Sequence, residues 1–320
     1  MSKHDYDCHF YGPQMITRRL FSFLAMPAIL ALTMPFASAR DVTHIMGTTS
    51  VPEAPVRIVA LTNEATEDLL ALGIVPVGAV RSANANPWFD HVAAQLADTI
   101  LVGEELAPDM ETIAALEPDL IIGNKKRHEK IYDQLSAIAP TVFVENITGQ
   151  WRENLAVYSG AIGKSAEGEA LLADYQRRVE AIQSELGDRR AEKVGLVRFI
   201  AGQNYAYNND SFSGSILRDI GFGRPAAQDK PGLAEPITKE RIPDLDGDRL
   251  LYFSYETGDG LALEEQKAWL ADPLWQALDA AKAGHVYGVS DTVWATAGGI
   301  MAAHLALDDI ERIYGIASTR

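Results

Sequence analysis

The sequence contains little cysteine and little positive charge. Cys8 is the single cysteine among 320 residues, which excludes a small fold held together by disulfides. Lysine and arginine total 28 against 44 aspartate and glutamate residues, so the formal net charge is −16. Because proteins bind nucleic acid largely by neutralising phosphates with cations, this balance excludes nucleic acid as a partner.

Catalytic and metal-binding motifs are absent as well. The sequence contains no Gly-x-Ser-x-Gly nucleophile elbow and no His-Glu-x-x-His zinc motif. The seven histidines are scattered, and we expect His285 and His304 to be packing or surface residues. We therefore expect a protein that binds rather than catalyses and that needs no cofactor. An exported hydrolase that uses paired carboxylates stays open as the alternative of another class.

The first 39 residues have the composition of a secretory signal peptide. Arg18 and Arg19 precede an apolar run at residues 20–36, and the small residues Ala37, Ser38 and Ala39 follow it. A run of 17 residues is shorter than the roughly 20 residues that a membrane-spanning helix needs. We expect cleavage after Ala39 and export to the periplasm. No cysteine stands at the cleavage point, so no lipid anchor is expected.

The rest of the chain alternates short apolar runs with helical stretches. The apolar runs lie at residues 56–61, 74–80, 119–123, 141–144, 194–200 and 250–254. Such alternation is typical of an α/β fold whose mostly parallel sheets are flanked by helices. We expect two lobes of this kind.

Residues 165–187 separate the two regions. Apolar residues recur there at helical spacing from Leu172 to Leu186, whereas Arg178 is expected on the solvent side. At 1.5 Å per residue this helix reaches about 30 Å, the width of a lobe, so it predicts a single rigid connection. The expected division is a signal peptide at 1–39, an N-terminal lobe at 40–164, the connecting helix at 165–187 and a C-terminal lobe at 188–320. Residues 1–14 would be an extension of the signal peptide if translation starts at Met1 rather than Met15.

A short pattern recurs in both halves. A Glu, an Ile, a Leu and an Asp occupy the same offsets in residues 111–119 and 240–248, each time before a predicted strand. The repetition predicts two related lobes in which Glu111 and Glu240 hold equivalent places.

Cations at predicted strand ends are the candidate binding residues. Arg81, Lys125 and Arg127 follow predicted strands of the first lobe, and Arg198 lies inside a predicted strand of the second. Ligands of parallel sheets bind beyond the carboxyl ends of the strands, and arginine forks bind carboxylates at two points. The pattern predicts a cleft for a small, multiply charged anion. The alternative is that each arginine pairs with a neighbouring acid.

Aromatic residues accompany the cations. Trp88, Tyr205, Tyr207, Tyr255 and Trp294 all fall in loop-like or strand-end stretches, where they can wall a pocket and donate hydrogen bonds.

Several of these stretches resemble the iron–siderophore substrate-binding proteins of ABC importers. The similarity is strongest at residues 57–64, 113–127, 129–140 and 294–299 and extends over nearly all of 55–316. It is closest to members that take citrate-based or citrate–hydroxamate siderophores. The resemblance implies a monomeric periplasmic receptor that binds a ferric siderophore, with the iron held by its chelator and not by the protein. The same scaffold with haem or a cobalamin as ligand stays an alternative.

The resemblance also implies which residues act. The ligand-facing residues would be Asn63, Arg81, Trp88, Lys125, Arg127, Arg198, Tyr207 and Trp294. Glu111 and Glu240 would pair with arginines of an inner-membrane ABC permease. Their alternative role is that of exposed carboxylates near helix starts, where the helix dipole favours negative charge.

Overall fold

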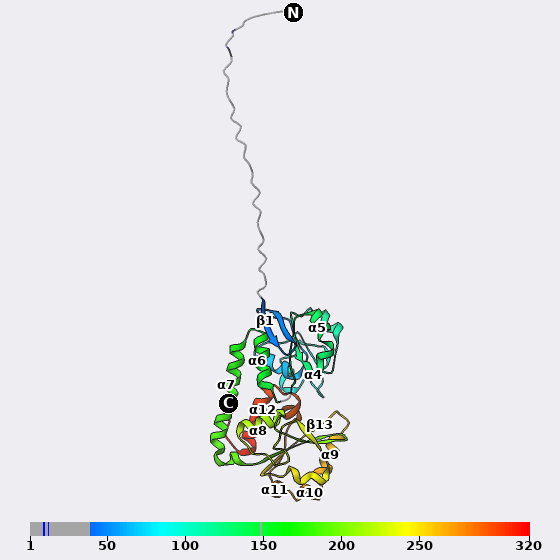
Figure 1. Cartoon of the computed structure of the whole chain (residues 1–320), viewed down its shortest axis with the longest axis vertical. Coiled ribbons are helices and arrows are strands. Elements are labelled where there is room, and N and C mark those ends of the chain that lie inside the picture. Colours follow the sequence, from blue (N-terminus) through cyan, green and yellow to red (C-terminus); the bar gives the residue numbers. More distant parts are fainter. Residues whose placement is uncertain (1–8, 10–11, 13–38, 148) are drawn as a thin grey trace, which may run out of the picture. The chain divides into compact units, whose positions relative to one another are not determined.

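The structure, a computed structural model, describes His9, Gly12 and residues 39–147 and 149–320 (Figure 1). Most of the predicted signal peptide and of the extension at 1–14 therefore lies outside the described residues. Ala39 begins strand β1 (Ala39–His44), which pairs antiparallel with β2 (Gly47–Pro52). Within the described part of the chain, every helix is too short or too polar to cross a membrane.

The first lobe is built on a five-stranded parallel sheet with the strand order β5-β4-β3-β8-β9. Its strands are β3 (Ile58–Ala60), β4 (Gly78–Ala79), β5 (Ile100–Leu101), β8 (Leu120–Asn124) and β9 (Thr141–Val144). Its helical segments are α1 (Asn63–Ala71), α2 (Asp90–Ala93), α3 (Met110–Ala115), α4 (Lys125–His128), η1 (Glu129–Ile131), α5 (Tyr132–Ile138) and α6 (Trp151–Ala161). The central strands are buried throughout because helices cover both faces, which explains their continuous apolar runs.

The second lobe is built on a sheet with the strand order β12-β11-β10-β13-β14. Its strands are β10 (Val194–Ile200), β11 (Asn204–Tyr207), β12 (Ala234–Ile237), β13 (Arg249–Tyr255) and β14 (Val286–Gly288). Strands β10, β13 and β14 run parallel, whereas β11 runs antiparallel to both of its neighbours, β10 and β12. The helical segments are η2 (Gly187–Ala191), α8 (Phe212–Ile220), η3 (Lys239–Leu245), α9 (Leu261–Leu270), α10 (Pro273–Gln276), α11 (Asp279–Lys282), η4 (Thr292–Thr296) and α12 (Ile300–Tyr314).

One long helix, α7 (Ser165–Leu186), runs alongside both lobes (Figure 1). Its buried residues include Tyr175, Val179, Ile182 and Leu186, which form the apolar stripe that the sequence predicts. The predicted fold class, two α/β lobes joined by a long helix, is confirmed.

Arg178 is the exception on this helix. The sequence pattern places it on the solvent side, but its side chain is only 4% exposed. Its Nη2 lies 2.8 Å from Asp308 Oδ1 and 3.0 Å from Glu311 Oε1, both on α12. These two carboxylates compensate the loss of water around the guanidinium, so the buried charge links α7 to α12.

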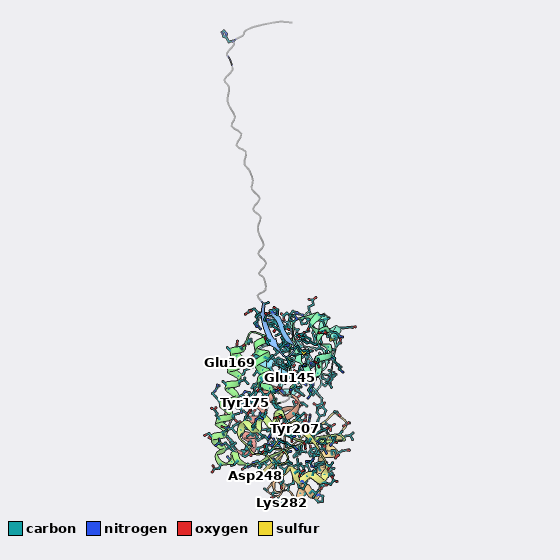
Figure 2. All side chains as sticks on the ribbon, in the orientation of Figure 1. Glu145, Glu169, Tyr175, Tyr207, Asp248 and Lys282 are labelled. Atoms are coloured by element: carbon teal, nitrogen blue, oxygen red, sulfur yellow. The ribbon has the colours of Figure 1, made fainter. Side chains whose placement is uncertain are left out.

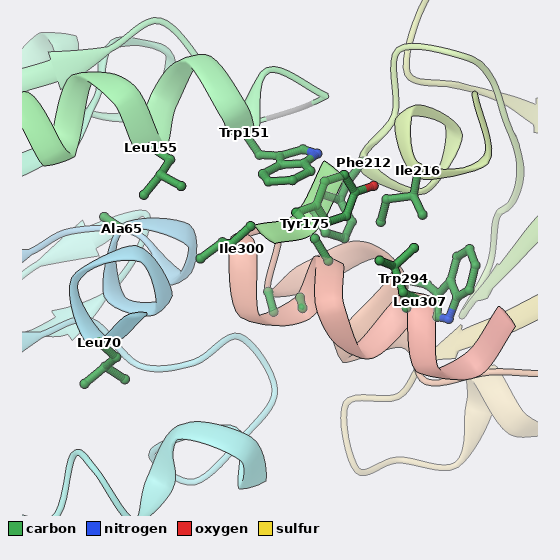
Figure 3. Packing of buried hydrophobic residues seen from close by; sticks show 14 of the residues in the cluster. Ala65, Leu70, Trp151, Leu155, Tyr175, Phe212, Ile216, Trp294, Ile300 and Leu307 are labelled. Carbon is green, nitrogen blue, oxygen red and sulfur yellow. The ribbon is translucent and has the colours of Figure 1, made fainter. Parts of the chain in front are cut away.

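A hydrophobic core continues from one lobe into the other. In Figure 3, Trp151 of α6 faces Tyr175 of α7 and Phe212 of α8. The rings of Trp151 and Tyr175 meet edge to face with centroids 5.0 Å apart. The Trp151 Nε1–H also donates to Ser215 Oγ at 3.2 Å. The lobes are therefore packed together beside α7 and not only tethered by it.

The repeated sequence pattern has the same structural role in both lobes. Asp119, just before β8, accepts hydrogen bonds from the backbone N–H groups of Val56 and Arg57 at 2.8 and 2.9 Å. Asp248, just before β13, accepts from the N–H of Lys193 at 2.7 Å. Each aspartate thus holds the chain that enters the neighbouring parallel strand, β3 or β10. This equivalence supports two related lobes.

Candidate functional site

A cavity of about 480 Å³ lies between the lobes and is lined by residues of both. Its polar and charged lining residues are Asn63, Arg81, Glu104, Glu105, Arg127, Arg198, Tyr207, Tyr255 and Thr296. Its remaining lining residues are Ala83, Leu106, Ile147, Ile200, Phe212, Leu233, Ala295, Ala297 and Gly298. A cavity of this size, part apolar and part charged, is typical of a site for a small polar molecule.

The structure brings three of the predicted cations to this cavity. Arg81 follows β4, and Arg127 lies in α4 directly after β8. The Asn124 side chain fixes the start of α4 by accepting a hydrogen bond from the Arg127 N–H at 2.9 Å. Arg198 reaches the same cavity from β10 in the other lobe. The cavity thus collects Arg81 and Arg127 from strand ends of the first lobe and Arg198 from within a strand of the second.

Each of the three arginines also has an acidic partner. Arg81 Nε lies 2.7 Å from Glu104 Oε1, and Arg127 forms an ion pair with Glu105. Arg198 donates hydrogen bonds to both carboxylate oxygens of Asp291, with Nε–Oδ1 and Nη2–Oδ2 distances of 2.6 and 2.8 Å. The three arginines therefore line one cavity and are also paired with acids. Their role in binding an anion stays a prediction.

Arg198 is the most enclosed of these cations. Its Nη1–H donates to the Tyr207 hydroxyl at 2.9 Å, and its guanidinium lies 4.9 Å from the centre of the Tyr255 ring. Burial disfavours its charge, but Asp291 and Tyr207 outweigh burial and raise the pKa of the guanidinium. Burial also raises the pKa of the Tyr207 hydroxyl, which is therefore neutral. Tyr207 lies in the second lobe on the side that faces the first (Figure 2).

Three predicted ligand-facing residues lie elsewhere. Trp294 is fully buried in the core beside Leu307 (Figure 3), and its Nε1–H donates to Asp309 Oδ2 at 2.9 Å. The short π-helical turn η4 directs the ring inward and leaves the following segment, 295–298, on the cavity wall. Lys125 forms an ion pair with Glu129, and Trp88 packs half-buried against the core. The structure does not bring these three side chains to the cavity.

The lining also contains residues that the sequence did not single out. Glu104, Glu105 and Leu106 come from a hairpin after β5, and Phe212 and Leu233 come from the second lobe. Tyr255, one of the strand-end aromatics, lines the cavity as well. The two glutamates follow a parallel strand, as Arg81 and Arg127 do. This position in the sequence could therefore have predicted them as cavity residues.

The cavity segment 295–298 is held in place by the first lobe. Glu67 of α1 accepts hydrogen bonds from the N–H groups of Gly299 and Ala302 at 2.9 and 3.1 Å. Its neighbour Asp68 accepts from the N–H of Ile300 at 3.2 Å. These are the unpaired amides at the start of α12, so the carboxylates cap that helix across the lobe boundary. A Cβ on Gly299 would lie 2.6 Å from Glu67 Oε2, which requires glycine there.

A further carboxyl group, that of Glu64, is buried beside this contact. Glu64 Oε1 accepts a hydrogen bond from Asn154 Nδ2 at 2.7 Å, but Oε2 has no partner among the described residues. Burial raises the pKa of Glu64 well above its usual value, and the negative charge of Asp68 raises it further. Burial also raises the pKa of Asp68. Both carboxyl groups are therefore protonated more readily in the folded protein than in the unfolded chain.

Glu111 and Glu240 lie on the surface, away from the cavity. Glu111 is in the first turn of α3, and Glu240 is in the first turn of η3. Each precedes a central parallel strand of its lobe, so the two glutamates hold equivalent positions. Hydrogen bonding to Thr238 lowers the pKa of Glu240, which keeps this carboxylate ionised.

The residues present do not form a metal site of their own. Among the residues described, no group of three or more His, Cys, Asp or Glu side chains is arranged to hold a metal ion.

Comparisons with known proteins agree on one family. The family model described as periplasmic binding protein matches residues 58–292. The chain is 46% identical to a probable siderophore-binding lipoprotein, YfiY, of Bacillus subtilis, covering 87% of this chain and 88% of that protein. It is 31% identical to the Fe(3+) dicitrate-binding periplasmic protein FecB of Escherichia coli, covering 91% and 95%. Staphylococcus aureus SirA in complex with staphyloferrin B is 32% identical, with a TM-score of 0.81 and coverage of 87% and 99%.

Proposed function

Because the chain belongs to the periplasmic binding protein family, we propose that it captures an anionic ferric siderophore and delivers it to an ABC permease. The ligand would be of the citrate-based or citrate–hydroxamate type and would bind between the lobes. The observation that carries this proposal is the meeting of Arg81, Arg127 and Arg198, from both lobes, on one cavity of a protein with a net charge of −16.

The chemistry of the cavity suits such a complex. Guanidinium groups bind carboxylates with paired hydrogen bonds, and burial strengthens these bonds by excluding water. Tyr207, Tyr255 and Phe212 supply aromatic surface for the parts of the chelator that carry no charge. We propose Asn63, Arg81, Arg127, Arg198 and Tyr207 as ligand-binding residues. The iron arrives as cargo inside its chelator, so no protein side chain needs to bind it.

Delivery would use the two exposed glutamates. Glu111 and Glu240, one on each lobe, would pair with arginines of an inner-membrane permease. Their support is the equivalent position of the two carboxylates, each before a central strand. We also propose that the functional division of the chain is a lobe at 40–164, the helix at 165–187 and a lobe at 188–320, and that the receptor acts as a monomer.

The family consists of substrate-binding proteins, and we propose that this member has no catalytic activity. The three relatives described above are named for siderophore or ferric citrate binding, which does not favour haem, a cobalamin or a hydrolase. One relative is named a lipoprotein and another a periplasmic protein. The name of the first relative conflicts with the expectation that this chain has no lipid anchor. That expectation rests only on the absence of a cysteine beside Ala39 and stays a prediction.

Native mass spectrometry tests the proposal most directly. The protein would be mixed with ferric citrate, ferric staphyloferrin B, ferric achromobactin, ferric enterobactin and hemin, each in turn. We expect a one-to-one complex with at least one of the first three and none with hemin. Binding of hemin alone, or of none of the five, would show that the function is different.

A further inference from the structure

Two consecutive carboxylates share the cavity with the arginines. Glu104 and Glu105 belong to the hairpin formed by β6 (Gly103–Glu104) and β7 (Ala107–Pro108). The charged residues of the lining are three arginines and these two glutamates. Asp291, which pairs with Arg198, adds a third carboxylate beside the cavity, so the cations and the carboxylates balance. A wall with this balance matches a weakly charged anion better than a multiply charged one.

The base of the hairpin is held by its neighbours. The Gly103 carbonyl accepts a hydrogen bond from the Arg81 N–H at 2.8 Å, and the Asp109 N–H donates to the Val102 carbonyl at 2.8 Å. Gly103 has a φ of +93°, and a Cβ there would lie 2.7 Å from the Ala107 carbonyl oxygen. The turn is therefore tight and specific to glycine.

A buried histidine holds the tip. His128 Nδ1 accepts a hydrogen bond from the Asn124 N–H at 3.3 Å, so the ring hydrogen is on Nε2. Nε2 then donates to the Glu105 carbonyl oxygen at 2.8 Å. Burial lowers the pKa of His128, which keeps the ring neutral and this hydrogen-bond arrangement in place. The hairpin that carries the two carboxylates is thus held at its base and at its tip.

Their exposure differs. The Glu105 side chain is 13% exposed and pairs with Arg127, whereas the Glu104 side chain is 56% exposed beside Arg81. An ionised carboxylate only accepts hydrogen bonds, so it attracts N–H and O–H donors of a ligand and repels ligand carboxylates. Repulsion of an unwanted ligand is a common means of specificity.

We infer that Glu104 and Glu105 are specificity-determining residues of the cavity. They disfavour ferric complexes with several negative charges, such as ferric citrate. They favour ferric complexes whose chelator presents ammonium, amide or hydroxyl donors beside its carboxylates. This inference rests on the proposed function, because it names the class of siderophore that the same cavity selects.

The test compares the wild type with E104Q/E105Q, in which both side chains keep their shape and lose their charge. The affinity for ferric citrate would be measured at neutral pH and low salt by quenching of tryptophan fluorescence. We expect the double variant to bind ferric citrate at least about tenfold more tightly than the wild type. Thermal unfolding would show that the variant is folded.

The matched control is E169Q/E185Q, which removes two exposed carboxylates of α7 and so makes the same change in net charge. We expect its affinity to change less than about twofold. The inference would be overturned if both double variants gained affinity for ferric citrate equally. It would also be overturned if E104Q/E105Q bound ferric citrate no more tightly than the wild type, or not at all. The proposed function would still stand if the wild type bound another ferric siderophore.

Discussion

Arg198 and Asp291 form a two-point ion pair at the cavity, with Nε–Oδ1 and Nη2–Oδ2 distances of 2.6 and 2.8 Å. Their side chains are only 13% and 6% exposed. A buried pair of this kind is costly to break by removing one partner, because the other charge stays buried without a counter-ion. Arg198 therefore has two separable roles, one in stability and one at the cavity.

The variant R198A should lose both roles. We expect its free energy of unfolding to fall by about 3 kcal/mol, because Asp291 loses its partner. In R198A/D291N most of that stability should return, whereas the affinity for the ferric siderophore should stay at least about tenfold below the wild type. Urea unfolding and fluorescence titration measure the two quantities. If removal of Asp291's charge also restored binding, Arg198 would not contact the ligand.

Arg127 and Lys125 offer a direct contrast, since both are cations of α4 but only Arg127 lines the cavity. We expect R127A to weaken ligand binding about tenfold or more, because a charge-assisted hydrogen bond contributes about 1.5–3 kcal/mol. K125A removes the same charge two residues away and should change affinity less than about twofold. Isothermal titration calorimetry would compare the two. Similar losses in both variants would point to a long-range effect of charge.

Reversing the charge of Glu111 and Glu240 should separate binding from delivery. In E111K/E240K we expect unchanged affinity for the ferric siderophore, because neither residue reaches the cavity. Uptake of radioactive iron by cells that depend on this receptor should fall at least about tenfold, because lysines would repel the arginines of the permease. E169K/E185K is the control for net charge. Normal uptake by E111K/E240K would remove the docking role.

Glu64 should make stability depend on pH in a defined direction. Its pKa is raised in the folded protein, so the folded state holds a proton that the unfolded state releases. Its contribution to stability is full below the unfolded pKa, near 4.5, and is lost as the pH rises toward the folded pKa. Asp68, Glu67 and Glu105 face the same group and raise its pKa by repulsion.

The variant E64Q keeps the acceptor for Asn154 and cannot titrate. We therefore expect its stability relative to the wild type to increase from about pH 5 to about pH 8. Urea unfolding across this range would measure the difference. A difference that stays constant with pH would mean that Glu64 is ionised in the folded protein.

The sequence predicted best those features of the structure that depend on residues close together in the chain. Apolar runs predicted the central strands, and the strand-end rule placed Arg81 and Arg127 near the cavity that the structure shows. Glu104 and Glu105 obey the same rule, but a carboxylate after a strand does not by itself suggest a site for an anion.

Other features depend on partners that are distant in the chain. Arg178 lies next to an apolar stripe, and its burial depends on Asp308 and Glu311, which come more than a hundred residues later. Trp294 lies four residues before the first glycine of the pair at 298–299, and the turn η4 directs its ring into the core. Helical spacing and residue type do not encode these orientations.

The hydrogen bonds from Gly299 and Ala302 to Glu67 limit what the receptor can do when cargo arrives. Any separation of α1 from the start of α12 would break both hydrogen bonds to a carboxylate that is only 1% exposed. The binding surface is consequently preformed, and little of the affinity is consumed in reshaping the protein. A joint of this kind favours small movements of the two lobes over a wide opening.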